Sequence, residues 1–170
     1  RIVMENYTHQ LTSNTCKIQF KTSKKGENKS ASDFESVVHT INIQACLNKK
    51  QGAKDWDSSI NIQLSLDQLI QLYSVMAAKI SHPDFFRPNK QVKFELQDHP
   101  TEPQTKTKAI YMYASDSSQN IIINHRVEWH DALVISHLAL DQYLRNFNEL
   151  PRELIVQSVV EQTHRFKPDK

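Results

Sequence analysis

Glycine is scarce in this sequence: Gly26 and Gly52 are the only two in 170 residues, and both fall in polar stretches. The loops that cradle phosphates in many nucleotide-dependent enzymes need several clustered glycines, because backbone N–H groups must approach the phosphate oxygens closely. The sequence therefore excludes loops of the Walker and dinucleotide-binding types. We predict that the protein uses no cofactor.

Cysteines and long apolar runs are also few. Cys16 and Cys46 each fall within an expected strand, so we expect free thiols rather than a disulfide. No stretch approaches eighteen consecutive apolar residues, and nothing near Arg1 resembles a signal peptide. These features predict a cytoplasmic protein that has no membrane partner.

The net charge of +2 is small but unevenly distributed. Lysine and arginine outnumber aspartate and glutamate by nine to five in residues 1–55, whereas the acids lead by eight to six in residues 111–170. At short range a partner responds to local rather than total charge. The basic N-terminal half therefore favours an anionic partner.

The clearest local pattern lies where the hydrophobic period changes from two to about 3.6 within three residues. Apolar and polar residues alternate over 59–65, as in a strand with one buried face. Ser65 can then cap a helix, and Asp67 suits the positive end of the helix dipole. We predict a strand over 59–65 that leads directly into a helix over 66–80.

Similar patterns recur along the chain. Period-two alternation predicts strands over 16–21, 36–48, 91–97, 108–114 and 121–125. Helical periodicity predicts two more helices, over about 129–147 and 151–166, with Pro151 at a favourable first position. The segments between the strands are polar, which is typical of hairpin loops.

The order is strand, strand, strand, helix, repeated once, with a further helix at the end. It predicts an α+β fold: two repeats of an antiparallel strand meander followed by a helix, plus a C-terminal helix. We expect an N-terminal arm over 1–15 and a single domain over 16–170. Within that domain the repeats cover about 16–85 and 88–150, and the C-terminal helix covers 151–166.

This order resembles the Whirly group of single-stranded nucleic-acid-binding proteins and the related transcriptional coactivator fold. The resemblance covers roughly residues 16–147 and rests on the element order and on the strand-to-helix joints at Ser65 and near Trp129. The chain lacks the Lys-Gly-Lys-Ala-Ala-Leu motif of that family; the nearest basic glycine segment, 24–29, has no small apolar residues. The resemblance implies exposed sheet faces that receive single strands, and assembly through the helices.

The outward faces of the expected strands carry lysines and amides with few acids. Such groups can neutralise phosphates and hydrogen-bond to base edges, and tyrosine rings can stack on bases. The candidate binding residues on these faces are Lys17, Gln19, Lys21, Asn42, Gln44, Lys93, Tyr111, Tyr113 and Arg126, and Lys24 and Lys25 join them from the basic hairpin loop expected over 22–33. Two alternatives stay open: a polar outer face is also typical of any soluble antiparallel sheet, and Tyr111 and Tyr113 can equally point into the core.

The eight histidines do not indicate a metal site. His130 and His137 share a helical face but are nearly two turns, or about 10 Å, apart along the axis, too far to share one ion. No serine or cysteine nucleophile stands beside a recognisable partner in the sequence. We therefore expect neither a metal nor catalytic activity.

The predicted function is binding of single-stranded DNA or RNA, with little sequence specificity, through polar and basic sheet faces. We also expect a homo-oligomer, because the second and third expected helices are rich in apolar residues. The alternative is a protein interaction or assembly module that oligomerises through its helices and binds no nucleic acid.

Overall fold

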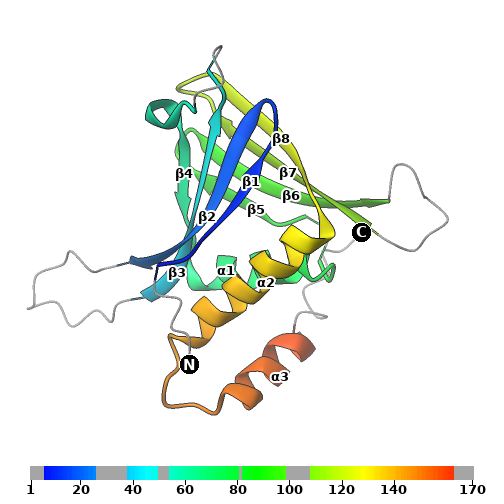
Figure 1. Cartoon of the computed structure of the whole chain (residues 1–170). Helices are drawn as coiled ribbons and strands as arrows, with labels where there is room; N and C mark the ends of the chain where they lie inside the picture. The colour runs from blue at the N-terminus through cyan, green and yellow to red at the C-terminus, as the bar shows by residue number, and fades with distance from the viewer. Residues whose placement is uncertain (1–5, 26–37, 50–53, 81, 99–107, 163–170) are drawn as a thin grey trace, which may run out of the picture.

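The computed structural model describes residues 6–25, 38–49, 54–80, 82–98 and 108–162 (Figure 1). Its first sheet contains β1 (Thr8–Thr12), β2 (Cys16–Lys25), β3 (Val38–Leu47) and β4 (Ile60–Gln63) in that order. Its second sheet contains β5 (Asp84–Arg87), β6 (Lys90–Asp98), β7 (Lys108–Asp116) and β8 (Ile121–Val127). The helices are η1 (Trp56–Ser58, a short 3₁₀ helix), α1 (Leu66–Met76), α2 (Trp129–Leu144) and α3 (Arg152–Gln162).

The predicted fold class is confirmed: each antiparallel meander leads into a helix, and α3 follows the second. Each sheet nevertheless has one strand more than the alternation indicated. Residues 8–12, which the sequence analysis placed in an arm, form the edge strand β1, and residues 84–87, expected in a connection, form β5. Both strands are short and bury a single apolar side chain each, Leu11 and Phe85, so the period-two signal is weak.

The joint between β4 and α1 forms as expected, but the helix ends earlier. The backbone N–H of Ser65 donates to Oε1 of Gln68 at 3.1 Å, which closes half of a capping box. Ala78 has a φ of 57°, and the N–H of Lys79 donates to the carbonyl of Ser74 at 2.8 Å. This left-handed termination stops α1 at Met76, four residues before the predicted end.

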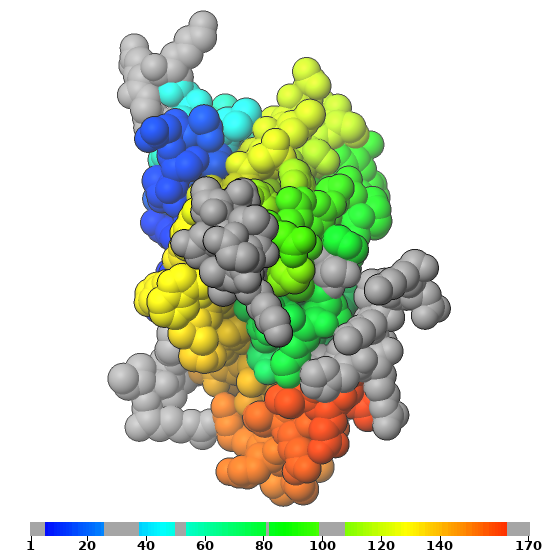
Figure 2. All heavy atoms as spheres, turned by 90° about the vertical axis from the view of Figure 1, so that its right-hand side faces the viewer, coloured from blue at the N-terminus to red at the C-terminus, as the bar shows by residue number. Residues whose placement is uncertain are grey.

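The two sheets pack inner face to inner face and share one hydrophobic core with α1 and α2. The rings of Phe20 on β2 and Phe94 on β6 lie 6.5 Å apart, and both side chains are fully buried. Helices α1 and α2 pack together across one end of the two sheets, and α3 lies beyond them (Figure 1). The outer faces of the two sheets consequently point to opposite sides of the molecule (Figure 2).

Both cysteines are free and buried, as expected. Among the described residues, no helix has both the length and the apolar character that crossing a membrane requires.

Candidate nucleic-acid interface

The outer face of the first sheet is an almost uninterrupted array of amides, hydroxyls and lysines. Its central rows across the four strands are Thr8, Lys21, Asn42 and Gln63, and then Gln10, Gln19, Gln44 and Asn61. Lys17 and Lys25 lie on the same face, one at each end of β2. Within the described strands β1 to β4 this face carries no carboxylate, and we call it the amide face.

Side chains on the amide face hold one another in place. Gln63 donates to Oγ of Ser23 at 2.7 Å, and Gln44 donates to Oγ of Ser59 at 3.0 Å. An amide has two donor hydrogens and an acceptor oxygen, so each of these groups can make further hydrogen bonds to a ligand. The exception is Gln19, which is only 8% exposed and offers little surface.

An aromatic ring accompanies the lysine at one end of the amide face. Nζ of Lys17 lies 5.9 Å from the centre of the Trp56 ring of η1, within the range of a cation–π contact. Trp56 was not among the predicted binding residues because it lies in a segment whose composition is typical of a polar loop. It also missed Gln10, which sits in the residues assigned to the arm.

The outer face of the second sheet gathers the other predicted aromatic and basic residues. Lys93 pairs with Tyr113 across β6 and β7, and Tyr111 pairs with Arg126 across β7 and β8. Both tyrosines are half-buried and lie on the outer face, which decides between the two orientations left open by the sequence. We call this surface the tyrosine face.

Carboxylates partly neutralise the tyrosine face. Lys93 lies 3.5 Å from Glu95, and Arg126 lies 2.8 Å from Glu128. The hydrogen bond and charge of Glu128 raise the pKa of the Arg126 guanidinium above its ordinary value. The tyrosine face therefore offers a phosphate less unpaired positive charge than the amide face does.

Two apolar side chains stand exposed on the tyrosine face. Phe86 of β5 is 62% exposed, and Ile122 of β8 is 70% exposed. They lie in one row with Gln91 and Ser115, at the two edges of the sheet. Both residues occupy exposed positions next to buried ones along their strands. The sequence pattern would have predicted the exposure of Phe86 only if β5 had been predicted as a strand.

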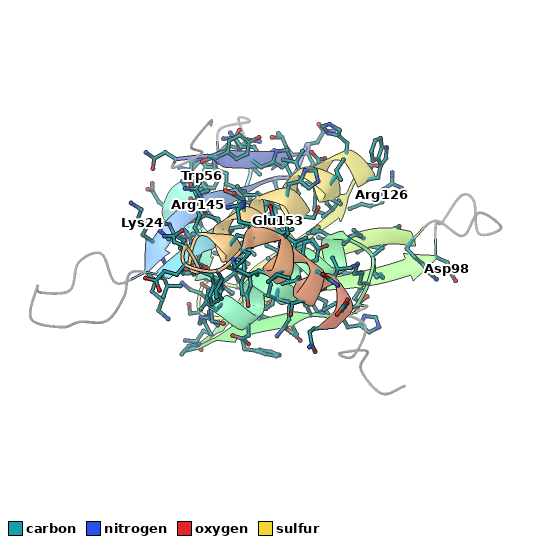
Figure 3. All side chains as sticks on the ribbon, turned by 90° about the horizontal axis from the view of Figure 1, so that it is seen from below. Lys24, Trp56, Asp98, Arg126, Arg145 and Glu153 are labelled. Atoms are coloured by element: carbon teal, nitrogen blue, oxygen red, sulfur yellow. The ribbon has the colours of Figure 1, made fainter. Side chains whose placement is uncertain are left out.

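Lys24 and Lys25 lie in β2, which corrects the prediction that they belong to a hairpin loop, and Lys24 lies on neither outer face. β2 continues through Lys25, so Lys24 points to the opposite side of the sheet from Lys21 and Lys25. It lines a pocket beside α2 instead. Seen from below, Lys24 and Arg126 lie on opposite sides of the molecule (Figure 3).

Two histidines make contacts between separate elements of the fold. Nε2 of His9 lies 2.8 Å from Asp131, which links β1 to the first turn of α2. Nδ1 of His125 lies 4.0 Å from Sγ of Cys16, across the two sheets. In the described part of the chain, no three histidine, cysteine, aspartate or glutamate residues lie close enough together to hold a metal ion.

The contact between Cys16 and His125 was not expected, since the sequence offered no partner for a thiol. Burial raises the pKa of the Cys16 thiol, but hydrogen bonds from His125 and Ser13 outweigh it and set that pKa below its ordinary value. Cys16 is 1% exposed, so a macromolecular substrate cannot reach its sulfur without rearrangement. The pair is a partly buried contact between the two sheets.

Comparison with known proteins finds similarity in structure alone. No family model and no curated protein matches this sequence. The solved structure of the plant transcriptional regulator PBF-2 superposes with a TM-score of 0.55 at 13% identity, covering 97% of this chain and 90% of that one.

Two Arabidopsis thaliana proteins are similar to the same degree. WHY3 superposes with a TM-score of 0.56 at 9% identity, covering 91% of this chain and 94% of its own. WHY1 superposes with a TM-score of 0.58 at 8% identity, covering 99% and 98%. The chain therefore has a Whirly-like fold.

Proposed function

We propose that the protein binds single-stranded DNA or RNA with little sequence preference, and that it acts as a binding protein rather than an enzyme. The observation that carries the proposal is the amide face, on which lysines and amides cover a described sheet surface that has no carboxylate. Lysines neutralise phosphates of any sequence, and amides accept and donate hydrogen bonds at base edges.

The tyrosine face supports the same function by a different contact. Base stacking on an aromatic ring contributes on the order of 1–3 kcal/mol per base and tolerates any sequence. Nζ of Lys93 lies 5.2 Å from the centre of the Tyr113 ring. Lys93 must therefore move away before a base can stack on the face of the Tyr113 ring that it covers. After that movement, its ammonium group can reach a phosphate of the bound nucleic acid.

The structural neighbours add to this support. The family resemblance implies single-strand binding on sheet faces, and one of the similar structures is that of a plant transcriptional regulator. Because the two outer faces point to opposite sides, a single strand reaches both only by passing around an edge (Figure 2). We therefore assign the main phosphate contacts to the amide face and a separate stacking contribution to the tyrosine face.

Binding is tested by fluorescence anisotropy with a labelled single strand of about 30 nucleotides at low salt. We expect both DNA and RNA single strands to bind, and a matched duplex to bind more weakly because its bases are not available for stacking. The absence of binding at tens of micromolar would overturn the proposal.

Exposed leucines on the helices favour a second role, in homo-oligomer assembly. Leu133 on α2 is 44% exposed, Leu150 before α3 is 55% exposed, and Leu154 on α3 is 62% exposed. Such residues are commonly covered by a partner chain. By contrast, two other apolar residues of these helices, Leu138 of α2 and Val159 of α3, are buried within the chain.

A further inference from the structure

The amide face carries a line of lysines that no carboxylate interrupts. Lys17, Lys21 and Lys25 recur every four residues along β2 and all point outward. Because a strand rises about 3.4 Å per residue, the line is about 27 Å long. Lys21 and Lys25 form no ion pair with a carboxylate of the described chain. The amide face therefore attracts the phosphates of a nucleic acid along most of the length of β2.

The tyrosine face offers aromatic rings in place of this charge. Tyr111 and Tyr113 stand two residues apart on β7, and strand geometry separates such positions by about 6.8 Å, twice the spacing of stacked bases. Phe86, which is 62% exposed, lies in the adjacent row of the same face. The spacing leaves room for one base between the two tyrosines, and a further base can stack on Phe86.

Positive charge also remains beside Phe86. The Arg87 guanidinium donates to the backbone carbonyl of Phe86 at 2.6 Å and to Oε1 of Gln68 at 2.8 Å, and its third acceptor is a backbone carbonyl of β4. All three acceptors are neutral. Asp84, the carboxylate of the same strand, accepts its hydrogen bonds from Gln91 instead. Arg87 can therefore attract a phosphate next to a base that stacks on Phe86.

The two faces are too far apart for one short nucleic-acid strand to occupy both. The buried rings of Phe20 and Phe94 lie between the sheets, and the faces point to opposite sides of the molecule (Figure 2). Stacked sheets lie about 10 Å apart, so phosphates outside the two sets of outward side chains would be separated by roughly 20 Å or more. That separation is about two Debye lengths at 0.1 M salt, so one bound strand would repel a second only weakly.

We propose that one chain binds two single-stranded segments at once, one on each outer face, and so links them. The segments belong either to two nucleic-acid molecules or to distant parts of one long molecule. This inference rests on the proposed function, because both contacts are with single strands, and it adds a second site of different chemistry. Contacts on the amide face are mainly electrostatic and those on the tyrosine face are mainly stacking, so salt should separate the two sites.

The number of short oligonucleotides bound per chain tests the inference. An oligonucleotide of about eight nucleotides has the size of one single-strand site. Sedimentation velocity with an excess of labelled oligonucleotide gives the ratio of oligonucleotide to protein chain, which does not depend on the oligomeric state. We expect two per chain at low salt. A tenfold rise in salt should raise the Kd of the amide-face site about 25- to 120-fold for two or three phosphate contacts, which leaves one per chain.

Substitutions then disable each face separately. Tyr111→Thr with Tyr113→Thr removes both rings but keeps side chains that favour strands, and it should leave one oligonucleotide that high salt releases. Lys17→Gln with Lys21→Gln should leave one oligonucleotide whose binding changes little with salt. Tyr111→Phe with Tyr113→Phe is the matched control and should keep two. Circular dichroism shows whether each variant folds, and the salt titration of the wild type tests the two sites without any substitution.

An oligonucleotide of about 30 nucleotides distinguishes the two sources of the segments. One per chain, bound at least about tenfold more tightly than the short one, shows that a single molecule supplies both segments, and either double variant should remove that gain. Two per chain show that separate molecules supply them.

Failure of this inference differs from failure of the proposed function. One short oligonucleotide per chain, lost in the lysine double variant and retained in full in the tyrosine double variant, would overturn the two-site assignment and leave single-strand binding intact. If no oligonucleotide binds at any salt concentration, single-strand binding itself is wrong.

Discussion

Phe20 of β2 and Phe94 of β6 face each other across the core with ring centres 6.5 Å apart, and neither ring is accessible to solvent. Phe94 also lies 6.2 Å from Phe85 of β5, in an edge-on arrangement. These rings join the two sheets, so the opposed directions of the outer faces depend on them.

Replacing Phe94 should therefore destabilise the whole domain. We expect Phe94→Ala to lower the free energy of unfolding by about 3–5 kcal/mol, through lost burial and the cavity that remains. Phe86→Ala is a matched control, because that ring is 62% exposed in the neighbouring strand and should change stability by less than about 0.5 kcal/mol. Urea unfolding followed by circular dichroism measures both. Equal effects of the two substitutions would contradict the packing described.

Asp116 should make stability depend on pH. Hydrogen bonds from Ser118 and Gln119 in the β7–β8 turn lower the pKa of its carboxyl below the ordinary value. A carboxyl whose pKa is lower in the folded state stabilises the protein above the unfolded pKa, and this contribution is lost as the pH falls through the folded pKa.

We expect Asp116→Asn to be less stable than the wild type at neutral pH, with the difference shrinking as the pH falls from neutral through the lowered pKa of the folded state. Thermal midpoints measured across this pH range test the prediction. A difference that stays constant with pH would show that the charge on Asp116 does not provide the stabilisation.

Tyr113 and Tyr111 should affect binding more than stability. Both are half-buried on the tyrosine face, so Tyr113→Ala and Tyr111→Ala should each weaken single-strand binding by up to about 1–3 kcal/mol, with little change in salt dependence. Tyr113→Phe keeps a ring and should bind almost as the wild type does. Affinity and thermal midpoint are measured on the same proteins. A large loss of stability with unchanged affinity would assign these rings a structural role instead.

The exposed leucines predict self-association. Light scattering at tens of micromolar should give a mass above that of one chain, and Leu154→Glu should shift it toward the monomer because a carboxylate cannot be buried there without a partner. The matched control is Leu47→Glu on β3, which is 36% exposed and far from α3 in the chain. A monomeric wild type at this concentration would exclude the predicted oligomer.

Much of this fold could be predicted from the sequence because the strand faces alternate regularly. Ile41, Ile43 and Ala45 are buried, whereas Asn42 and Gln44 face outward, as the pattern of β3 indicates. Short strands carry too little of this signal, which is why β1 and β5 escaped detection. The sequence alone does not show which way the tyrosines of β7 point. Ile110 and Met112, which alternate with them along the strand, are equally plausible core residues.

The site was harder to predict, since contacts between distant residues leave no local pattern. The 109-residue separation between Cys16 and His125, and the pocket that brings Lys24 of β2 to Arg145, depend on how the elements pack. Lys24 faces one side of the sheet only because β2 extends as far as Lys25. Residues 21–25 are all polar, so they have no apolar alternation from which the end of the strand could be predicted. The amide face was largely predicted because it needs only the alternation of each strand.

The most direct test of single-strand binding on the amide face is the salt dependence of affinity in lysine variants. Anisotropy titrations over a range of salt concentrations give the slope of log Kd against log salt for the wild type, Lys17→Gln, Lys21→Gln and the double variant. Lys79→Gln, just after the C-terminal end of α1 and beside Tyr73, is the control.

Each lysine removed from the amide face should reduce the slope by about 0.7–1 and weaken binding alike for all sequences. The double variant should show the sum of the two changes, and Lys79→Gln should match the wild type. An unchanged slope in the double variant, or an equal change in Lys79→Gln, would contradict binding on this face.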